Sequence, residues 1–231
     1  MQKKLLITGA SRGIGFETAS ILAEQGHHIV AVARSADKLD QLVSLHPGSI
    51  TAISADLAMD DGILKIKNTI NQENIRLDGL LNNAGVLINK PFTQQNREDW
   101  LAQANVNMIA PALLIRELVP FFNKNAHIVN IGSMGGFQGS SKFPGLSAYS
   151  ATKGALAILT ECIAAELANE SVSCNCLCLG AVQTEMLNSA FPGIEVPMQP
   201  EQMGAYIAEF LLNAHTFYNG KLLPVSLADP A

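Results

Sequence analysis

Short apolar runs alternate with longer amphipathic stretches along the whole chain. The apolar runs predict strands at Lys4–Ile7, His28–Ala33, Ser49–Ser54, Gly79–Asn82, His127–Ile131, Val172–Cys178 and Leu222–Val225. Most of them are apolar at consecutive positions, which is typical of strands that are covered on both faces. The stretches between them predict helices near Gly13–Gln25, Ala36–Leu45, Asp61–Asn71, Asn96–Phe122, Tyr149–Asn169 and Pro200–Asn213.

This alternation predicts an α/β fold, with a doubly wound parallel sheet of about seven strands flanked by helices, a Rossmann fold. The length of 231 residues and the hydrophobic fraction of 48% suit a single domain over residues 1–231. Two long segments, Gly132–Ser147 and Gly180–Pro200, are expected to be irregular. Long loops in compact domains tend to be functional.

The charge pattern and the hydropathy pattern exclude some classes of partner. The formal net charge is −5 and no basic block is present, which argues against nucleic acid. No apolar run is long enough to cross a membrane, and Met1–Lys4 leads directly into a strand without a secretory signal. We therefore expect a cytoplasmic protein with no membrane partner.

Three of the four cysteines, Cys174, Cys176 and Cys178, alternate along one predicted strand and so share one face of it. Three thiols in a row on a strand do not converge as the ligands of a tetrahedral metal site do. We interpret them as small buried hydrophobic residues and expect no metal. Reduced thiols also suit the cytoplasm.

A glycine-rich turn, Thr8-Gly9-Ala10-Ser11-Arg12-Gly13-Ile14-Gly15, follows the first predicted strand. Glycine permits a tight turn and a close approach of the backbone to a ligand, and free N–H groups at the next helix start can bind a pyrophosphate. The turn therefore indicates a dinucleotide site, and an ordinary strand-to-helix turn is the alternative. The residues expected to contact the dinucleotide here are Gly9, Ser11, Arg12, Gly13, Ile14 and Gly15.

The end of the second predicted strand bears on the choice of nucleotide. An NAD site usually places an acid there, whereas this chain has Arg34 and no acid before Asp37. The guanidinium groups of Arg34 and Arg12 match the oxygens of a 2′-phosphate, so we favour NADP(H) over NAD(H). Two solvated surface arginines are the alternative. Asp56, after the third strand, is a candidate for the adenine amino group or, equally, for the N-cap of the next helix.

Tyr149 and Lys153 are four residues apart in a predicted helix and therefore share one of its faces. A neighbouring ammonium favours the phenolate, so we expect Lys153 to lower the pKa of Tyr149 and make it an acid or base near neutral pH. Ser133 stands at the carboxyl end of a strand, where ligands bind in doubly wound sheets, and its hydroxyl can polarise a carbonyl. Taken alone, Ser133 is an ordinary loop serine.

Together these motifs resemble the short-chain dehydrogenase/reductase family. The matching segments, in the family's order, are Thr8–Gly15, Asn82–Gly85, Val106–Asn107, Ser133 and Tyr149–Lys153. The resemblance implies catalysis by Asn107, Ser133, Tyr149 and Lys153. Asn107 would anchor a water that relays protons to Lys153, and the alternative for Asn107 is an asparagine that only bonds to helix backbone. Lys153 would also hold the nicotinamide ribose. The cofactor site would also include Leu57, Asn83, Ala84, Gly85, Gly180, Val182 and Thr184, with Thr184 at the nicotinamide carboxamide.

The chain departs from the family pattern in its last third. The segment between Thr184 and Pro200 is short, which implies a reduced lid and an open substrate site. Leu222–Leu227 lacks the family's acidic-Gly-Gly ending, which puts the common tetramer in doubt, and we expect a homodimer. The apolar positions of Asn96–Phe122 and Tyr149–Asn169 either form its interface, as in relatives, or pack on the sheet. Apolar residues of the two long segments either line a substrate pocket or only pack: Met134, Phe137, Phe143, Leu146, Met186 and Phe191.

We interpret the chain as a cytoplasmic oxidoreductase that transfers a hydride between NADP(H) and a small carbonyl or alcohol substrate, with Tyr149 as general acid and base. A 3-oxoacyl-acyl-carrier-protein reductase is an alternative, but Lys142 is the only basic residue in the two long segments that could meet an acidic carrier. A non-catalytic NAD(P)-binding regulator is a further alternative, which would need neither Ser133 nor Tyr149.

Overall fold

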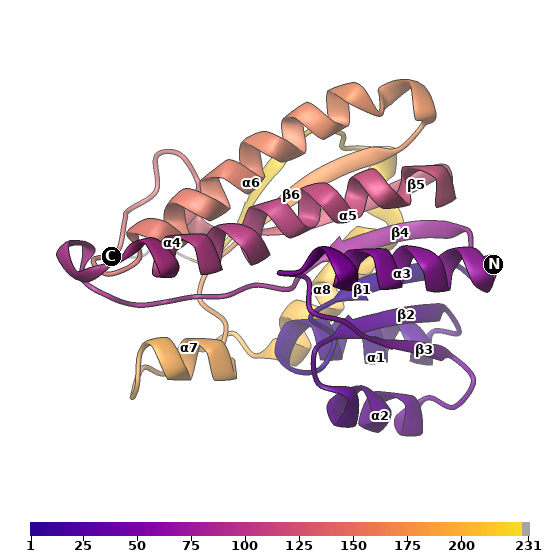
Figure 1. Cartoon of the computed structure of the whole chain (residues 1–231), viewed down its shortest axis with the longest axis horizontal. Helices are drawn as coiled ribbons and strands as arrows, with labels where there is room; N and C mark the ends of the chain where they lie inside the picture. Colours follow the sequence, from indigo (N-terminus) through magenta and orange to yellow (C-terminus); the bar gives the residue numbers. More distant parts are fainter. Residues whose placement is uncertain (228–231) are drawn as a thin grey trace.

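The computed structural model describes residues 1–227, and the last four residues of the predicted domain, 228–231, lie outside that part. Its centre is a seven-stranded parallel sheet with the strand order β3-β2-β1-β4-β5-β6-β7 (Figure 1). The strands are β1 (Lys4–Thr8), β2 (His28–Ala33), β3 (Ile50–Ser54), β4 (Leu77–Asn82), β5 (Phe122–Ser133), β6 (Ser173–Leu179) and β7 (Leu222–Val225). The predicted doubly wound α/β fold is confirmed.

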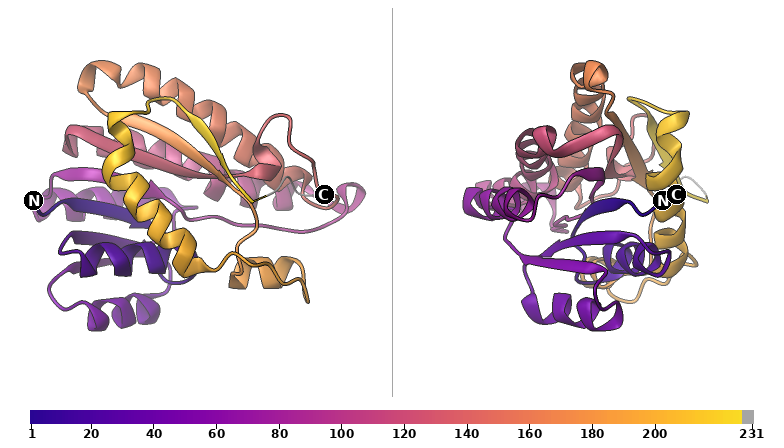
Figure 2. Two further views of the ribbon diagram at one scale, coloured as in Figure 1. Left: turned by 180° about the vertical axis from the view of Figure 1, so that it is seen from behind. Right: turned by 90° about the vertical axis from the view of Figure 1, so that its right-hand side faces the viewer.

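Helices cover both faces of this sheet, so that the molecule has three layers (Figure 2). One face carries α1 (Gly13–Glu24), α2 (Ala36–Leu45) and α8 (Pro200–Asn213). The other face carries α3 (Asp60–Gln72), α5 (Ala110–Leu118) and α6 (Ser147–Glu166), with α4 (Arg97–Ala104) beside α6. A helix layer on each side explains why the strands are apolar at consecutive positions.

The first strand illustrates how the apolar core is divided. Leu5 and Ile7 are fully buried in the cluster that contains α1 and α8, whereas Leu6, also fully buried, points into the cluster that contains α3 and α5. Successive side chains of a strand point to opposite faces, so each residue of an unbroken apolar run is buried in one of the two core clusters. Burial of each such side chain contributes about 1.5–3 kcal/mol relative to its exposure.

The prediction of a single helix over Asn96–Phe122 is wrong for the middle and for the end of this segment. The structure has α4, then a π-helical turn η2 (Asn105–Ile109), then α5, and Phe122 already belongs to β5. Pro111 has no N–H to donate to the carbonyl of Asn107, four residues before it, so the regular helical hydrogen bonds are interrupted there. The proline in the sequence was the available signal for this irregularity.

The segment Gly180–Pro200, predicted to be irregular, contains a short helix, α7 (Glu185–Ala190). The Thr184 hydroxyl accepts a hydrogen bond of 3.2 Å from the Leu187 N–H and so caps this helix. In Figure 1, α7 stands at the carboxyl end of the sheet, away from the helix layers. The chain after β6 is therefore an ordered element at the edge where ligands bind in such folds.

Cys174, Cys176 and Cys178 are buried on β6 and unpaired, whereas Cys162 on α6 is exposed. Cys176 and Cys178 pack with Met134 beneath the end of β5. The prediction that the alternating cysteines are small buried residues is confirmed. Among residues 1–227, no helix has the length and apolar character needed to span a membrane.

Candidate active site

A cleft of about 550 Å³ opens at the carboxyl ends of the strands. It lies at the point where β1 and β4 are neighbours and the strand order changes direction, which is where doubly wound sheets bind ligands. Its walls include residues at or just after the carboxyl ends of six successive strands: Gly9, Ser11–Ile14, Arg34, Asp56–Leu57, Asn83–Leu87, Ser133–Gly135, Gly180–Val182 and Thr184. Residues far apart in the sequence thus meet around one space.

The glycine turn after β1 is shaped by two different constraints. Gly9 has φ of +69°, a left-handed conformation that favours glycine. A Cβ on Gly15 would overlap Nδ2 of Asn83 and the carbonyl oxygen of Gly9, so only glycine lets α1 approach this closely. Gly15 lies behind the turn and is not among the cleft residues. It shapes the turn and does not face a ligand.

Hydrogen bonds from Thr8 tie this turn to the segment after β4. The Thr8 hydroxyl accepts from the N–H groups of Asn83, at 3.0 Å, and Ala84, at 3.1 Å. The Asn83 side chain in turn donates to the Thr8 carbonyl at 3.0 Å. Two walls of the cleft are therefore held at a fixed spacing before any ligand binds.

The start of α1 offers a group of backbone donors to the cleft. The N-cap residue Arg12 makes no side-chain cap, and Gly13 and Ile14 line the cleft. Uncapped N–H groups at a helix start, together with the positive end of the helix dipole, favour an anion. The site therefore fits the pyrophosphate of a dinucleotide.

Charged side chains surround one end of the cleft, which we call the adenosine end. Arg12 and Arg34 both line it, and the Arg34 side chain makes no ion pair with a described residue. Arg12 Nη1 lies 2.5 Å from Oε2 of Glu185. Asp56 also lines the cleft, but its Oδ1 accepts from the Ala58 N–H at 3.0 Å. Asp56 is not the N-cap of α3, because that position is taken by Met59.

Ser133, Tyr149 and Lys153 meet at the other end, which we call the catalytic end. Ser133 ends β5, the other two lie on one face of α6, and all three line the cleft. A side-chain hydrogen bond joins Ser133 and Tyr149. The Lys153 ammonium donates to the carbonyl of Ile131 at 2.7 Å and lies 5.9 Å from the centroid of the Tyr149 ring.

The expected effect of Lys153 on Tyr149 is wrong for this structure. Burial raises the pKa of Tyr149 to about 12, and the hydrogen bond with Ser133 offsets only part of that increase. Burial also lowers the pKa of Lys153 to about 8, against the opposing influence of Cys176 and Cys178. Desolvation is the largest cause of both shifts, and the Lys153 ammonium donates to the Ile131 carbonyl and not to the phenol.

Asn107 lies in the π-helical turn, fully buried behind the cleft. Its Oδ1 accepts from the N–H of Val86 at 2.8 Å, and its Nδ2 donates to the Val86 carbonyl at 2.9 Å and to the Thr152 hydroxyl at 3.1 Å. A Cβ on Gly85 would lie 3.4 Å from Oδ1 of Asn107 and 3.6 Å from Nζ of Lys153. Asn107 and Lys153 therefore flank the same glycine, and Asn107 braces the segment after β4 against α6.

The catalytic end opens into an apolar space. The apolar side chains that line it are Val86, Leu87, Met134, Phe143, Leu146, Met186, Leu187, Phe191 and Ile194. Phe137 is absent from this wall, because it packs against the Met134, Cys176 and Cys178 cluster. The prediction for the other five apolar residues of the two long segments agrees with the structure.

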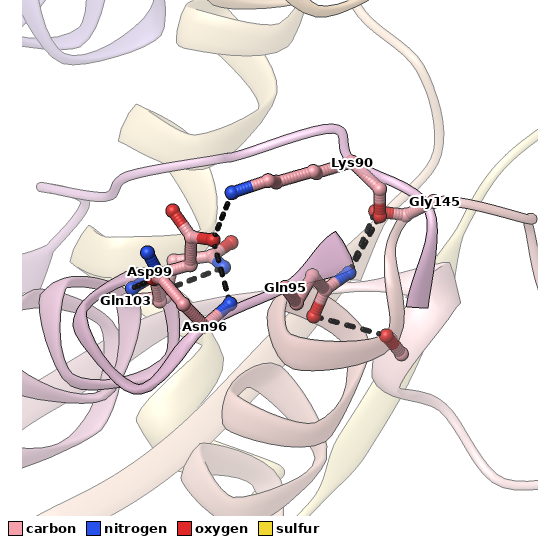
Figure 3. A network of polar contacts seen from close by, with 7 residues as sticks. Lys90, Gln95, Asn96, Asp99, Gln103 and Gly145 are labelled. Atoms are coloured by element: carbon pink, nitrogen blue, oxygen red, sulfur yellow. Dashed lines mark hydrogen bonds and ion pairs between the residues drawn. The ribbon is translucent and has the colours of Figure 1, made fainter. Parts of the chain in front are cut away.

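Polar contacts brace the rim of this apolar space (Figure 3). Lys90 makes an ion pair of 2.7 Å with Asp99, and Gln95 donates to the carbonyls of Lys90 and Gly145. The Lys142 ammonium is likewise occupied, since it donates to the Phe137 carbonyl at 2.6 Å. The lysines near the rim are therefore engaged with the protein itself.

Of the residues that the sequence predicts for catalysis or cofactor binding, Gly15 and Asn107 do not line the cleft and the rest do. Both lie directly behind its wall, against Asn83 and Val86 respectively. Sequence reasoning missed Glu185, which lines the cleft opposite Arg12. No local pattern announces that contact, because the partners are 173 positions apart.

Comparison with known proteins gives a consistent picture. The family model described as short chain dehydrogenase matches residues 3–195. The chain is 30% identical over 250 residues to dehydrogenase/reductase SDR family member 4 of Mus musculus, covering 99% of this chain and 88% of that protein. It is 32% identical over 189 residues to 3-oxoacyl-acyl-carrier-protein reductase of Thermotoga maritima, covering 80% of this chain and 76% of that protein.

Solved structures agree in fold. A short chain dehydrogenase from Burkholderia cenocepacia in complex with NADP superposes with a TM-score of 0.89 at 25% identity, over 99% of this chain and 98% of that one. A 3-ketoacyl-(acyl-carrier-protein) reductase from Brucella melitensis complexed with NADH gives a TM-score of 0.86 at 25% identity, over 96% of each chain. Similar proteins thus hold either nucleotide.

Proposed function

The chain belongs to the short chain dehydrogenase family, and on that premise we propose that it transfers a hydride between NADP(H) and a carbonyl or alcohol substrate. The observation that carries the proposal is the group formed by Ser133, Tyr149 and Lys153 in the same cleft as the glycine turn. A binding protein would need the turn alone. A hydroxyl pair beside a buried amine supplies what carbonyl reduction needs in addition, which is a proton donor at the oxygen.

Each residue at the catalytic end has a role that its surroundings support. The raised pKa of Tyr149 keeps its hydroxyl protonated at neutral pH, so it can donate a proton to the carbonyl oxygen in reduction. Ser133 holds the same oxygen through its hydroxyl, and Lys153 resupplies the proton from a pKa of about 8. Asn107 positions the segment after β4, and a water anchored there would connect Lys153 to solvent.

The remaining cleft residues are assigned to the nucleotide. The nicotinamide supplies or accepts the hydride when it is bound, and Lys153 and Thr184 would hold its ribose and carboxamide. The glycine turn and the first N–H groups of α1 suit the pyrophosphate. The residues assigned to the rest of the nucleotide are Asp56, Leu57, Asn83, Ala84, Gly85, Gly180 and Val182. Arg12 and Arg34 at the adenosine end favour NADP(H) over NAD(H), because a guanidinium matches the oxygens of a 2′-phosphate.

The apolar space at the catalytic end favours a small, uncharged carbonyl substrate. A 3-oxoacyl group on an acyl carrier protein is the alternative, and the relatives that carry that name support it. An acidic carrier needs free cations near the mouth of the cleft. Lys90 is paired with Asp99, and Lys142 is the only basic residue of the two long segments, so few free cations stand near the mouth, which favours the small carbonyl.

We also propose that the chain forms a single cytoplasmic dehydrogenase domain that assembles as a homodimer. Exposed apolar side chains on α4, η2 and α6 support the dimer, with Leu101, Ile109 and Ile158 exposed by 46%, 36% and 60%. Unpaired cysteines suit a reducing compartment. Light scattering of the purified protein tests the dimer, and the mass of a single chain would contradict it.

The test of the function is a screen of NADPH and NADH oxidation with ketones, aldehydes, quinones and β-ketoesters, both free and attached to acyl carrier protein. We expect turnover with free apolar carbonyls and a preference for NADPH. Turnover with carrier-bound substrates alone would favour the carrier-protein reductase. Nucleotide binding without oxidation across the whole panel would favour a non-catalytic regulator.

A further inference from the structure

One carboxylate at the adenosine end contacts two cationic side chains from other parts of the chain. Oε2 of Glu185 lies 2.5 Å from Nη1 of Arg12, and its Oε1 lies 3.5 Å from Nζ of Lys38. Glu185 begins α7, whereas Arg12 belongs to the glycine turn and Lys38 to α2. A single side chain thus links the segment after β6 to the glycine turn and to α2.

The segment 184–190, which we call the strap, is held across the mouth of the cleft at both of its ends. At its start, a Cβ on Gly13 would lie 3.5 Å from Cγ2 of Thr184, so the threonine methyl packs over the glycine turn. At its end, the carbonyl of Ala190 accepts from Nδ2 of Asn89 at 2.8 Å. The position of α7 at the carboxyl end of the sheet follows from these contacts (Figure 1).

Some of the charged side chains at the adenosine end are paired with one another and others are not. The Arg12 guanidinium hydrogen-bonded to Glu185 holds the pKa of that carboxyl below its usual range, with Lys38 adding to the effect, so Glu185 is ionised at neutral pH. Asp56, the other acid in the cleft wall, is occupied by the Ala58 N–H. Arg34 has no ion-pair partner among the described residues. Of three cations near this end, two therefore already face an anion.

We propose that Glu185 is a specificity-determining residue, which competes with a nucleotide 2′-phosphate for Arg12 and Lys38 and so limits the preference for NADP(H) over NAD(H). The inference rests on the proposed dinucleotide site. A carboxylate and a phosphate use the same donors of a guanidinium, so both cannot hold Arg12 in the same way at once. NAD(H) carries no 2′-phosphate and does not enter this competition.

The size of the effect follows from exposure. The side chains of Arg12, Lys38 and Glu185 are 52%, 42% and 55% exposed, so water and salt screen the pairs. Exposed ion pairs are worth little, and we expect Glu185→Gln to tighten NADP⁺ binding about threefold to fivefold. Binding of NAD⁺ should change by less than about 1.5-fold, because the substitution leaves the backbone N–H groups at the start of α1 in place for the pyrophosphate.

The test is calorimetric titration of wild-type protein and Glu185→Gln with NADP⁺ and with NAD⁺. Adenosine 2′,5′-bisphosphate and adenosine 5′-monophosphate serve as probes of the adenosine end alone. Glu195→Gln is the matched control, since Glu195 lies between the strap and α8, is exposed and has no side-chain hydrogen bond or ion pair with the described residues. Each titration is repeated at roughly 0.02 M and 0.5 M salt, where Debye lengths of about 20 Å and 4 Å separate screened from unscreened behaviour.

The proposal requires that Glu185→Gln tighten NADP⁺ and the 2′,5′-bisphosphate selectively, that high salt shrink this gain, and that Glu195→Gln do neither. Equal tightening of both dinucleotides would overturn it, because the strap would then control access to the cleft and not the phosphate. Weaker binding of NADP⁺ to Glu185→Gln would overturn it as well. Wild-type protein that binds neither dinucleotide would refute the dinucleotide site itself. Wild-type protein that binds both, with the same ratio of NADP⁺ to NAD⁺ affinity in Glu185→Gln, would refute only the role of Glu185.

Discussion

At the catalytic end of the cleft Lys153 is 4% exposed, whereas at the adenosine end Arg12 and Glu185 keep 52% and 55% of their side chains in solvent. The buried amine has a pKa lowered to about 8 by desolvation, and its contact with Ile131 is a single well-defined hydrogen bond. The exposed pair is governed by charge and is screened by salt. Substitutions at the buried end should therefore have large effects that salt does not change, and those at the exposed end small, selective effects that it does.

The largest expected effect comes from Tyr149→Phe. The substitution keeps the ring but removes the hydroxyl that Ser133 contacts, which is the proton donor in the proposed reaction. We expect turnover to fall by about a thousandfold or more, with nucleotide affinity unchanged within about twofold. Steady-state rates and calorimetric titration measure the two quantities. Tyr206→Phe, at a half-exposed tyrosine on α8, is the control, and full activity in Tyr149→Phe would remove Tyr149 from the mechanism.

The second effect concerns stability and pH. Burial lowers the pKa of Lys153 from 10.5 in the unfolded chain to about 8, so the unfolded state binds more protons between these values. The contribution of Lys153 to the free energy of unfolding therefore rises with pH through this window. Lys153→Met removes the buried ammonium, so the free energy of unfolding of the variant should exceed that of wild type by most below pH 8. That relative gain should shrink by on the order of 3 kcal/mol towards pH 10.5.

Urea unfolding of both proteins across this pH range measures the Lys153 effect. Lys124→Met is the control, because Lys124 is exposed and its charge is not buried on folding. A stability difference between Lys153→Met and wild type that stays constant from pH 7 to pH 10.5 would contradict the burial of a charged amine. In that case the contrast between the two ends of the cleft would lose its basis.

A smaller effect is expected from Arg34→Ala at the adenosine end. Arg34 lines the cleft and has no ion-pair partner among the described residues, so its guanidinium is available to a phosphate. We expect NADP⁺ affinity to fall about tenfold and NAD⁺ affinity to stay within about twofold. Arg97→Ala removes the same charge from an exposed position on α4 and should change neither. Equal losses for both nucleotides would place Arg34 outside the specificity site. The effect of Glu185→Gln, proposed above, is the smallest in this series.

Local patterns were sufficient for most of the fold. His28–Ala33, Ala36–Leu45 and Pro200–Asn213 have the bounds that the apolar pattern predicts. Local signals accompany two of them, the left-handed Gly26 before the first and the capping box of Gln199 and Gln202 at the start of the third. The π-helical turn was missed, since amphipathic periodicity says nothing of how a proline such as Pro111 is accommodated. The short helix α7 was missed because six residues are too few for a periodicity to be recognised.

The candidate site was predictable as far as motifs reach. The glycine turn and the Tyr149–Lys153 pair are local in sequence, and the topology of a parallel sheet brings them to one edge. The direction of the Tyr149 pKa was not predictable, because it depends on burial and on the choice of Ile131 as the partner of Lys153. The pairing of Arg12 with Glu185 depends on how the strap folds back, which no spacing encodes.

The side chain of Asn107 meets the backbone of Val86 with one donor and one acceptor, the same two groups that a peptide unit of a neighbouring strand would present. A side chain from a helix thus makes the pair of hydrogen bonds that one residue of a neighbouring strand would make. It ties the chain beyond β4 to the helical layer without adding a further strand, and Val86 itself still lines the cleft. Asn107→Ala would remove both hydrogen bonds to Val86 while leaving the hydrogen bonds of the sheet intact.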